Sequence, residues 1–265
     1  MDEKPASSQD ADSRLGIRQS RLLLAAWIGI AAATMIFVFS GAVLFAHMLD
    51  LSGSQRDRSL LQEFLQEFFA GANLTNANMQ PLGDEVFLSA FDAEMRRINP
   101  DYVCWITIEG TPADYPVVRG SDNERYLDTS FFGERNAFGT LFMDYRNAGE
   151  HVPHIIIYGH NSRHGNKFGE LHKFLDAHHL AMHPTITLRI NDRIVEYEIF
   201  AARHTDIHDP AYFLDFSAPG SFQTFAERVG APQGTVQIIT LSTCVSGDDI
   251  DGRVVVQGAL RQSSY

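Results

Sequence analysis

Cysteine is scarce in this sequence, and there is no excess of positive charge. Only 2 of the 265 residues are cysteine, which excludes a disulfide-rich scaffold and a zinc ribbon with four cysteine ligands. The chain has 33 acidic against 21 basic side chains, a formal net charge of -12. It therefore lacks the basic surface that a general nucleic-acid binder needs, and we expect no nucleic acid among its partners.

Common catalytic and metal-binding motifs are also missing. The sequence has no glycine-rich phosphate loop, no His-Glu-x-x-His and no Gly-x-Ser-x-Gly. His178, His179 and His183 lie close together, but no acidic or thiolate partner accompanies them at a fixed spacing. We therefore expect neither a metal nor a cofactor.

One long run without fixed charge stands near the N-terminus. Residues 22–49 are 28 residues long, and about 20 apolar residues in a helix suffice to span a bilayer. Arg14, Arg18 and Arg21 precede the run, so the positive-inside rule predicts a cytoplasmic segment at 1–21 and an extracellular location for everything after the run. The sequence thus predicts a single-pass protein of the cell membrane.

A cleavable signal peptide is the alternative interpretation of this run, with Ser40–Ala42 as its cleavage region. Signal peptides have apolar regions of only about 7–15 residues, which favours the uncleaved anchor. The four basic and four acidic groups of residues 1–49 cancel, so the whole negative excess lies on 50–265. Anionic lipid head groups would repel such a domain, and we expect it to stand off the membrane.

Residues 50–99 read as a linker followed by helices. Residues 51–58 are polar, and apolar side chains then recur at helical spacing from Leu60 to Phe69, which predicts an amphipathic helix ending near Gly71. A second helix is predicted over Phe87–Arg97, before Pro100.

From residue 100 to 265 the pattern changes to short β-rich runs separated by turn residues. A count of eight such strands with peripheral helices indicates a mainly β domain, a barrel or a sandwich. Two helical stretches interrupt them, at Lys167–His179 and at Phe222–Val229, the latter with Ser221 as its capping residue. The predicted strands are Val103–Ile108, Tyr115–Val118, Gly139–Met143, His154–Tyr158, Thr185–Arg189, Ile194–Ala201, Val236–Ser242 and Arg253–Leu260.

Cys244 ends one predicted strand, and Arg253 begins the next. If these strands pair as a hairpin, Arg253 returns to the level of Cys244, where a guanidinium favours the thiolate and can stabilise an oxyanion. His160 follows the strand 154–158 at a similar exit, where an imidazole can serve as general acid and base. Cysteine plus histidine is the combination that acyl transfer through a thioester needs. Cys104 is the only other cysteine, so a structural Cys104–Cys244 disulfide is the competing interpretation.

These residues stand in motifs that resemble a known family. In order, they are WITIEGT at 105–111, DYPV at 114–117, DNERYL at 122–127, GTLFMDY at 139–145, YGHN at 158–161, FGEL at 168–171, TLSTC at 240–244 and RVVV at 253–256. Over roughly residues 100–262 the chain resembles the sortases, the cysteine transpeptidases of Gram-positive bacteria, and the finer pattern is similar to class B. The resemblance implies an eight-stranded sortase-type β-barrel.

The resemblance also implies residue roles. Cys244 corresponds to the nucleophile, His160 to the general acid and base, and Arg253 to the anchor of the oxyanion or substrate backbone. Substrate-binding positions of class B relatives correspond to Asn123, Leu127, Tyr158, Ser242 and Thr243. Class B members often carry an acidic residue directly after the cysteine, and Val245 and Ser246 stand there instead.

The implied reaction cleaves a sorting signal of the Leu/Asn-Pro-x-Thr-Gly/Asn type at its Thr carbonyl through a thioester. The acyl group then passes to an amine of a cell-wall peptide precursor or a pilin. Two alternatives remain at this point: a cell-surface cysteine peptidase that hydrolyses the same thioester, and a non-enzymatic wall-binding module stabilised by a disulfide.

Overall fold

The computed structural model describes residues 34–41, 56–68, 70, 84–149, 152–161, 167–190, 193–244 and 251–261. The chain divides into two compact units, Met1–Ser52 and Gly53–Tyr265. In the first unit, residues 34–41 are helical, and the apolar side chains from Met35 to Phe39 are 64–79% exposed. Within the described residues, no helix has the length and apolar character to cross a membrane. Most of the predicted anchor at 22–49 lies outside the described residues.

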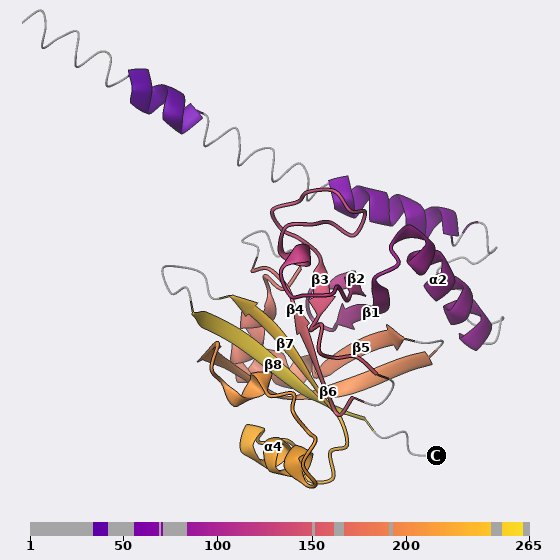
Figure 1. Cartoon of the computed structure of the whole chain (residues 1–265), viewed down its shortest axis with the longest axis vertical. Coiled ribbons are helices and arrows are strands. Elements are labelled where there is room, and N and C mark those ends of the chain that lie inside the picture. The colour runs from indigo at the N-terminus through magenta and orange to yellow at the C-terminus, as the bar shows by residue number, and fades with distance from the viewer. Residues whose placement is uncertain are drawn as a thin grey trace, which may run out of the picture. The chain divides into compact units, whose positions relative to one another are not determined.

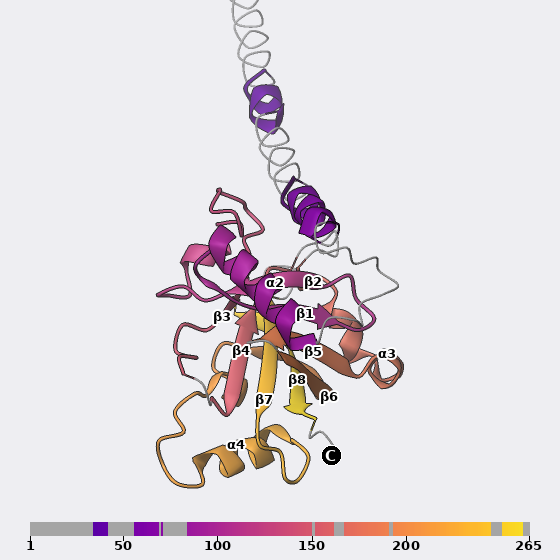
Figure 2. The ribbon, with the colours of Figure 1, turned by 90° about the vertical axis from the view of Figure 1, so that its right-hand side faces the viewer.

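The second unit is a closed barrel in the order β1-β2-β3-β4-β7-β8-β6-β5, drawn in Figures 1 and 2. Two neighbouring pairs, β2 with β3 and β4 with β7, are parallel, and the other six are antiparallel. The strands are β1 Tyr102–Ile108, β2 Asp114–Val118, β3 Leu141–Met143, β4 His154–Tyr158, β5 Thr185–Ile190, β6 Arg193–Asp206, β7 Ile238–Cys244 and β8 Gly252–Leu260.

The eight predicted strands are therefore confirmed, and the barrel is the correct choice between barrel and sandwich. The largest difference is in β6, which runs to Asp206, five residues beyond its predicted end. Its second half pairs with β8 from Ala202↔Val256 to Asp206↔Gly252. This half of β6 could not be predicted from hydrophobicity because its sequence is largely polar. Hydrogen bonds to β8 hold this half of the strand in place.

The two faces of the central strands pack against different layers. Ile155, Ile157, Ile239, Leu241 and Val256 belong to the main core. On the alternate positions, Ile238 packs with a second cluster formed by Phe222, Phe225, Ala226 and Val229 of α4 (Ser221–Val229). The crossover between β6 and β7 therefore packs α4 against the beginning of β7, and Figure 2 shows α4 at that end of the strands.

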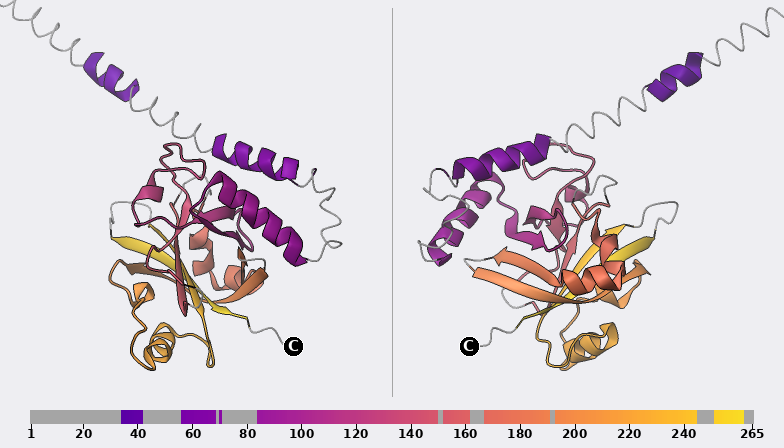
Figure 3. Two further views of the ribbon diagram at one scale, coloured as in Figure 1. Left: turned by 45° about the vertical axis from the view of Figure 1, so that its right-hand side comes forward. Right: turned by 180° about the vertical axis from the view of Figure 1, so that it is seen from behind.

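In the described part of the second unit, two helices precede the barrel, as predicted. Residues 56–68 are helical, and α2 spans Asp84–Ile98 (Figure 3). Phe68 meets Phe91 of α2 edge to face at 5.5 Å, and Phe91 meets Trp105 of β1 in the same way. The predicted apolar stripe thus joins the main core through α2. The helix includes residues 56–58, so the predicted linker at 51–58 was wrong at its C-terminal end.

Two predicted helical details were wrong. The stretch Lys167–His179 is not one helix: η2 (Leu171–Leu175) is a 3-10 turn, and α3 (Ala177–Met182) begins anew with the Asp176 carboxylate accepting from the His179 N–H. Ser221 does not cap α4. Gly220, in the left-handed region at φ 78°, occupies the N-cap, and the Ser221 hydroxyl donates to the Ala218 carbonyl.

Candidate active site

Strand register brings the three predicted catalytic positions to one end of the barrel. In the parallel β4–β7 pair Tyr158 lies opposite Ser242, and the Gly159 N–H donates to the Ser242 carbonyl at 3.1 Å. His160 lies two residues beyond Tyr158 and Cys244 two residues beyond Ser242, so both follow this pair at the same end of the parallel strands. In the antiparallel β7–β8 hairpin, Cys244 and Arg253 are direct partners, as predicted. The Cys244 side chain and residues 245–250, including Val245 and Ser246, lie outside the described part of the structure.

A groove of about 360 Å³ opens at this end of the strands. It is lined by His160 and Arg253 and by all five predicted substrate-binding residues, Asn123, Leu127, Tyr158, Ser242 and Thr243. Five further lining residues were not singled out from the sequence: Phe142, Arg146, Gly159, Ile207 and Tyr212. Except for Cys244, whose side chain is not described, the structure therefore gathers every predicted site residue in one cavity.

One buried carboxylate holds the wall of this groove. Asp144, just after β3, accepts hydrogen bonds from Arg146 Nε at 2.9 Å and Nη2 at 2.8 Å, from the Tyr158 hydroxyl at 2.9 Å and from Asn123 Nδ2 at 3.1 Å. Burial would raise the pKa of Asp144, but the hydrogen bonds from Arg146 and Tyr158 outweigh it, and the pKa lies below its usual range. Three lining side chains therefore depend on one ionised acid.

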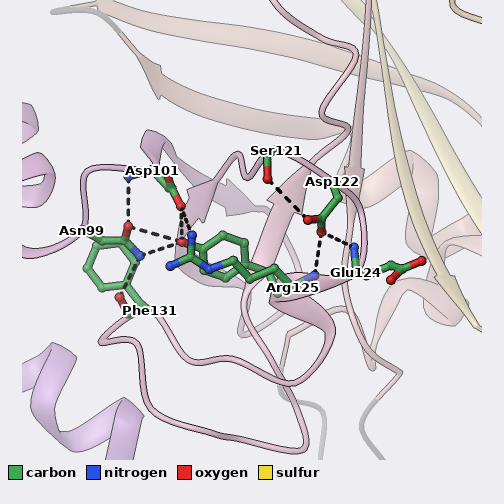
Figure 4. A network of polar contacts seen from close by, with 8 residues as sticks. Asn99, Asp101, Ser121, Asp122, Glu124, Arg125 and Phe131 are labelled. Carbon is green, nitrogen blue, oxygen red and sulfur yellow. Dashed lines mark hydrogen bonds and ion pairs between the residues drawn. The ribbon is translucent and has the colours of Figure 1, made fainter.

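Leu127 lines the groove and follows a loop that is held by a network of polar contacts, drawn in Figure 4. The Asp122 carboxylate accepts from the backbone N–H groups of Glu124 and Arg125, which starts η1 (Arg125–Leu127). Arg125 Nη1 then donates to Asp101 at 2.9 Å. The Leu127 side chain at the end of η1 is 44% exposed, so an apolar surface faces solvent at the groove.

The crossover from β6 to β7 also contributes to the lining of the groove. The Tyr212 ring, in η3 (Pro210–Tyr212), stacks on Tyr158 at 6.4 Å, and its hydroxyl hydrogen-bonds to Ser242 Oγ at 2.8 Å. Thr243 is only 4% exposed, and among the described residues its Oγ1 has no hydrogen-bond partner. A buried hydroxyl without a partner carries a free-energy cost.

The electrostatics at the head of the groove suit proton transfer. Burial lowers the pKa of His160, the positive charge of Lys167 lowers it further, and Asp128 opposes both. Arg253 Nη1 donates to the Gly252 carbonyl at 2.8 Å, which fixes the guanidinium near the start of β8. An imidazole and a guanidinium thus line the same cavity, next to the end of the strand that carries Cys244.

The disulfide interpretation is wrong. Cys104 lies buried in β1 as a free thiol, and burial raises its pKa. Among the described residues, no group of three or more histidine, cysteine or acidic side chains is arranged to hold a metal ion.

Comparisons with known proteins agree with this architecture. The sortase domain model matches residues 106–261. Sortase B of Listeria monocytogenes is 31% identical over 236 residues, which is 85% of this chain and 92% of that protein. Sortase B of Staphylococcus aureus is 31% identical over 160 residues, covering 57% of this chain and 66% of the relative.

Solved structures show the same likeness. The complex of Staphylococcus aureus sortase B with substrate superposes with a TM-score of 0.63 at 27% identity, covering 76% of this chain and 95% of that one. Clostridium perfringens sortase B gives a TM-score of 0.59 at 28% identity, covering 64% and 99%. Together with these relatives, the barrel and its groove are those of a cysteine transpeptidase. The chain belongs to the sortase family, and the relatives named here are sortases of class B.

Proposed function

We propose that this transpeptidase cleaves a C-terminal sorting signal of the Leu/Asn-Pro-x-Thr-Gly/Asn type at the Thr carbonyl and transfers the acyl group to an amine. The observation that carries the proposal is the single groove lined by His160 and Arg253 beside the strand end of Cys244. Its volume of about 360 Å³ falls within the usual range for a site that encloses a small ligand.

In the first step the Cys244 thiolate attacks the Thr carbonyl, and Arg253 stabilises the negative charge on the oxygen. The C–N bond breaks as His160, as imidazolium, protonates the leaving amine, and a thioester remains. In the second step an amine of a cell-wall peptide precursor or a pilin attacks the thioester. His160 accepts the proton from that amine, and the thiolate leaves, so the enzyme returns to its starting state.

The lining side chains supply complementary contacts for the peptide. Leu127 and Ile207, 44% and 43% exposed, offer apolar surface for the leading side chain and the proline of the signal. Asn123 uses its amide to hold Asp144 and the Tyr145 N–H, so its part in the site is to shape the wall.

Membrane anchoring belongs to the same proposal. The uncharged run at 22–49, preceded by three arginines, supports a single-pass anchor with the catalytic domain outside the cell. There the enzyme would meet both exported signals and wall precursors. Extraction of membranes with alkaline carbonate should leave the chain in the pellet, and recovery in the supernatant would contradict the anchor.

Product analysis tests the reaction. The full-length chain is incubated with signal peptides with and without candidate amines, and products are identified by mass spectrometry. We expect amine-linked product that disappears in Cys244→Ala and His160→Gln, whereas Cys104→Ala, the matched cysteine control, retains it. Hydrolysed product alone at saturating amine would favour the peptidase. Activity in Cys244→Ala would overturn the proposal.

A further inference from the structure

A lysine is tied by its backbone to the proposed general acid and base. Lys167 has a left-handed conformation at φ 56° and forms an isolated antiparallel bridge with Asn161. The next residue, Phe168, donates its N–H to the His160 carbonyl at 3.2 Å. The strained backbone at Lys167 is therefore held beside the segment that follows Gly159, by the bridge to Asn161 and by the hydrogen bond from Phe168 to His160.

The ammonium of Lys167 turns toward the N-terminal helix. Its Nζ lies 4.9 Å from the centroid of the Tyr115 ring, which is a cation–π contact. Lys167, Tyr115, Asp57 and Arg58 line one small cavity of about 20 Å³, with room for about one water molecule. Burial lowers the pKa of Lys167 to about 8, although the negative charge of Asp57 acts in the opposite direction.

Asp57 brings the helix of residues 56–68 into this cluster. Asn136 Nδ2 donates a hydrogen bond to the Asp57 carboxylate, and Arg56 of the same turn forms an ion pair with Glu134 at 3.8 Å. Burial raises the pKa of Asp57, whereas Asn136, Lys167 and Arg56 lower it, and Glu134 raises it. The first turn of this helix is thus fixed against the loop that follows η1.

The positive charge of Lys167 also acts on His160. Burial and Lys167 lower the pKa of the imidazole, and Asp128 raises it. Among the described residues, two other cations, Arg253 and Arg146, line the groove that His160 lines, and Arg146 is paired with Asp144. Lys167 itself lines the separate small cavity beside Asp57. Of these cations, Lys167 is the one whose charge is balanced by a residue of the N-terminal helix.

We propose that Lys167 is a positioning residue that links the N-terminal helix to catalysis, with Asp57 holding its ammonium where the charge adjusts proton transfer by His160. The inference rests on the proposed role of His160. A nearby cation favours neutral imidazole, the form that must accept a proton from the attacking amine in the second step. The helix that leads from the N-terminal unit would then adjust the balance between the two steps.

Histidine titration by NMR tests the charge effect without relying on activity. The full-length chain is titrated as wild type, Lys167→Met, Lys167→Arg and Lys173→Met, and His160→Gln identifies the signal. Lys173 is the matched control, because it is the other described lysine and pairs with Glu170 instead. We expect an upward shift of the His160 midpoint in Lys167→Met, and wild-type midpoints in Lys167→Arg and Lys173→Met. An unchanged midpoint in Lys167→Met overturns the inference while leaving the proposed function intact.

Two further measurements complete the test. In protein with labelled lysine, Asp57→Asn should lower the titration midpoint of Lys167, because the stabilising carboxylate is gone; an unchanged midpoint overturns the link to the helix. In the pH profile of amine transfer, the rise attributed to neutral His160 should move to higher pH in Lys167→Met and return in Lys167→Arg. If the histidine midpoint moves and this profile does not, Lys167 has no part in the reaction. If the proposed function itself were wrong, a different result would show it: His160→Gln would keep full activity.

Discussion

The carboxylate of Asp144 offers the most quantitative test of how the groove is built. Its side chain is fully buried and accepts hydrogen bonds from Arg146, Tyr158 and Asn123. Removing one partner of a buried ion pair costs about 3–5 kcal/mol. Because the Arg146 side chain is 46% exposed and can regain water, we expect the lower end of this range, about 3 kcal/mol, for Asp144→Ala. Asp144→Asn keeps one acceptor oxygen and should cost about 2 kcal/mol.

Urea unfolding of the full-length chain measures this loss, with Glu227→Gln as the control that removes one negative charge from the exposed side of α4. The same variants should raise KM for the signal peptide, because Tyr158 and Asn123 lose their common anchor. They should leave alkylation of Cys244 by a small reagent almost unchanged. Wild-type stability of Asp144→Ala, or an unaltered KM, would refute the reasoning.

The stabilisation by Asp144 should depend on pH, and the direction of this dependence follows from the pKa of its carboxyl group. The folded pKa of Asp144 lies below the ordinary carboxyl value, so its stabilisation is complete above the unfolded pKa of about 3.9. It is lost as the pH falls through the lower folded pKa. The stability difference between wild type and Asp144→Asn should therefore be full at neutral pH and vanish in strong acid. A difference that grows on acidification would contradict this assignment.

Three further predictions concern single side chains. Gly139→Ala should lower the free energy of unfolding by about 3 kcal/mol, as measured by urea unfolding. The φ angle of Gly139 is +52°, and an added Cβ would clash with the carbonyl oxygens of Tyr126 and Leu127. Wild-type stability of the alanine variant would disprove this constraint. Tyr212→Phe removes the bond to Ser242, worth about 1 kcal/mol, and should raise KM less than tenfold; a change in turnover alone would exclude this role. Thiol titration should find one reactive thiol per native chain and two after unfolding, because Cys104 is buried; two at native conditions would be inconsistent with the core described here.

Much of the barrel could be predicted from local patterns. Alternating β-branched residues bounded by glycine, proline and aspartate mark seven of the eight strands to within about two or three residues, because those strands bury one or both faces. The pairing of Cys244 with Arg253 also followed from the sequence, since two strands joined by a short loop form an antiparallel hairpin.

Contacts between segments far apart in the chain could not be predicted from the sequence. His160 and Cys244 lie at the same end of the barrel because β4 and β7 pair in parallel. The paired residues are about eighty positions apart in the chain, and no local pattern encodes such a register. Asp144 was visible only as part of a motif, and its contacts with Tyr158 and Asn123 arise from tertiary folding. The left-handed Lys167 sat in a stretch that looked helical, because helix propensity carries no information on a single strained residue.

The central claim is that Cys244, His160 and Arg253 act on one carbonyl group, and the acyl-enzyme tests it most directly. The full-length chain is mixed with signal peptide without amine, quenched in acid and mapped by mass spectrometry. We predict a Thr-terminated acyl group on Cys244 in wild type, none in His160→Gln, and formation slowed about 10²–10³-fold in Arg253→Ala. An acyl group on another residue, or wild-type rates in either variant, would contradict the account.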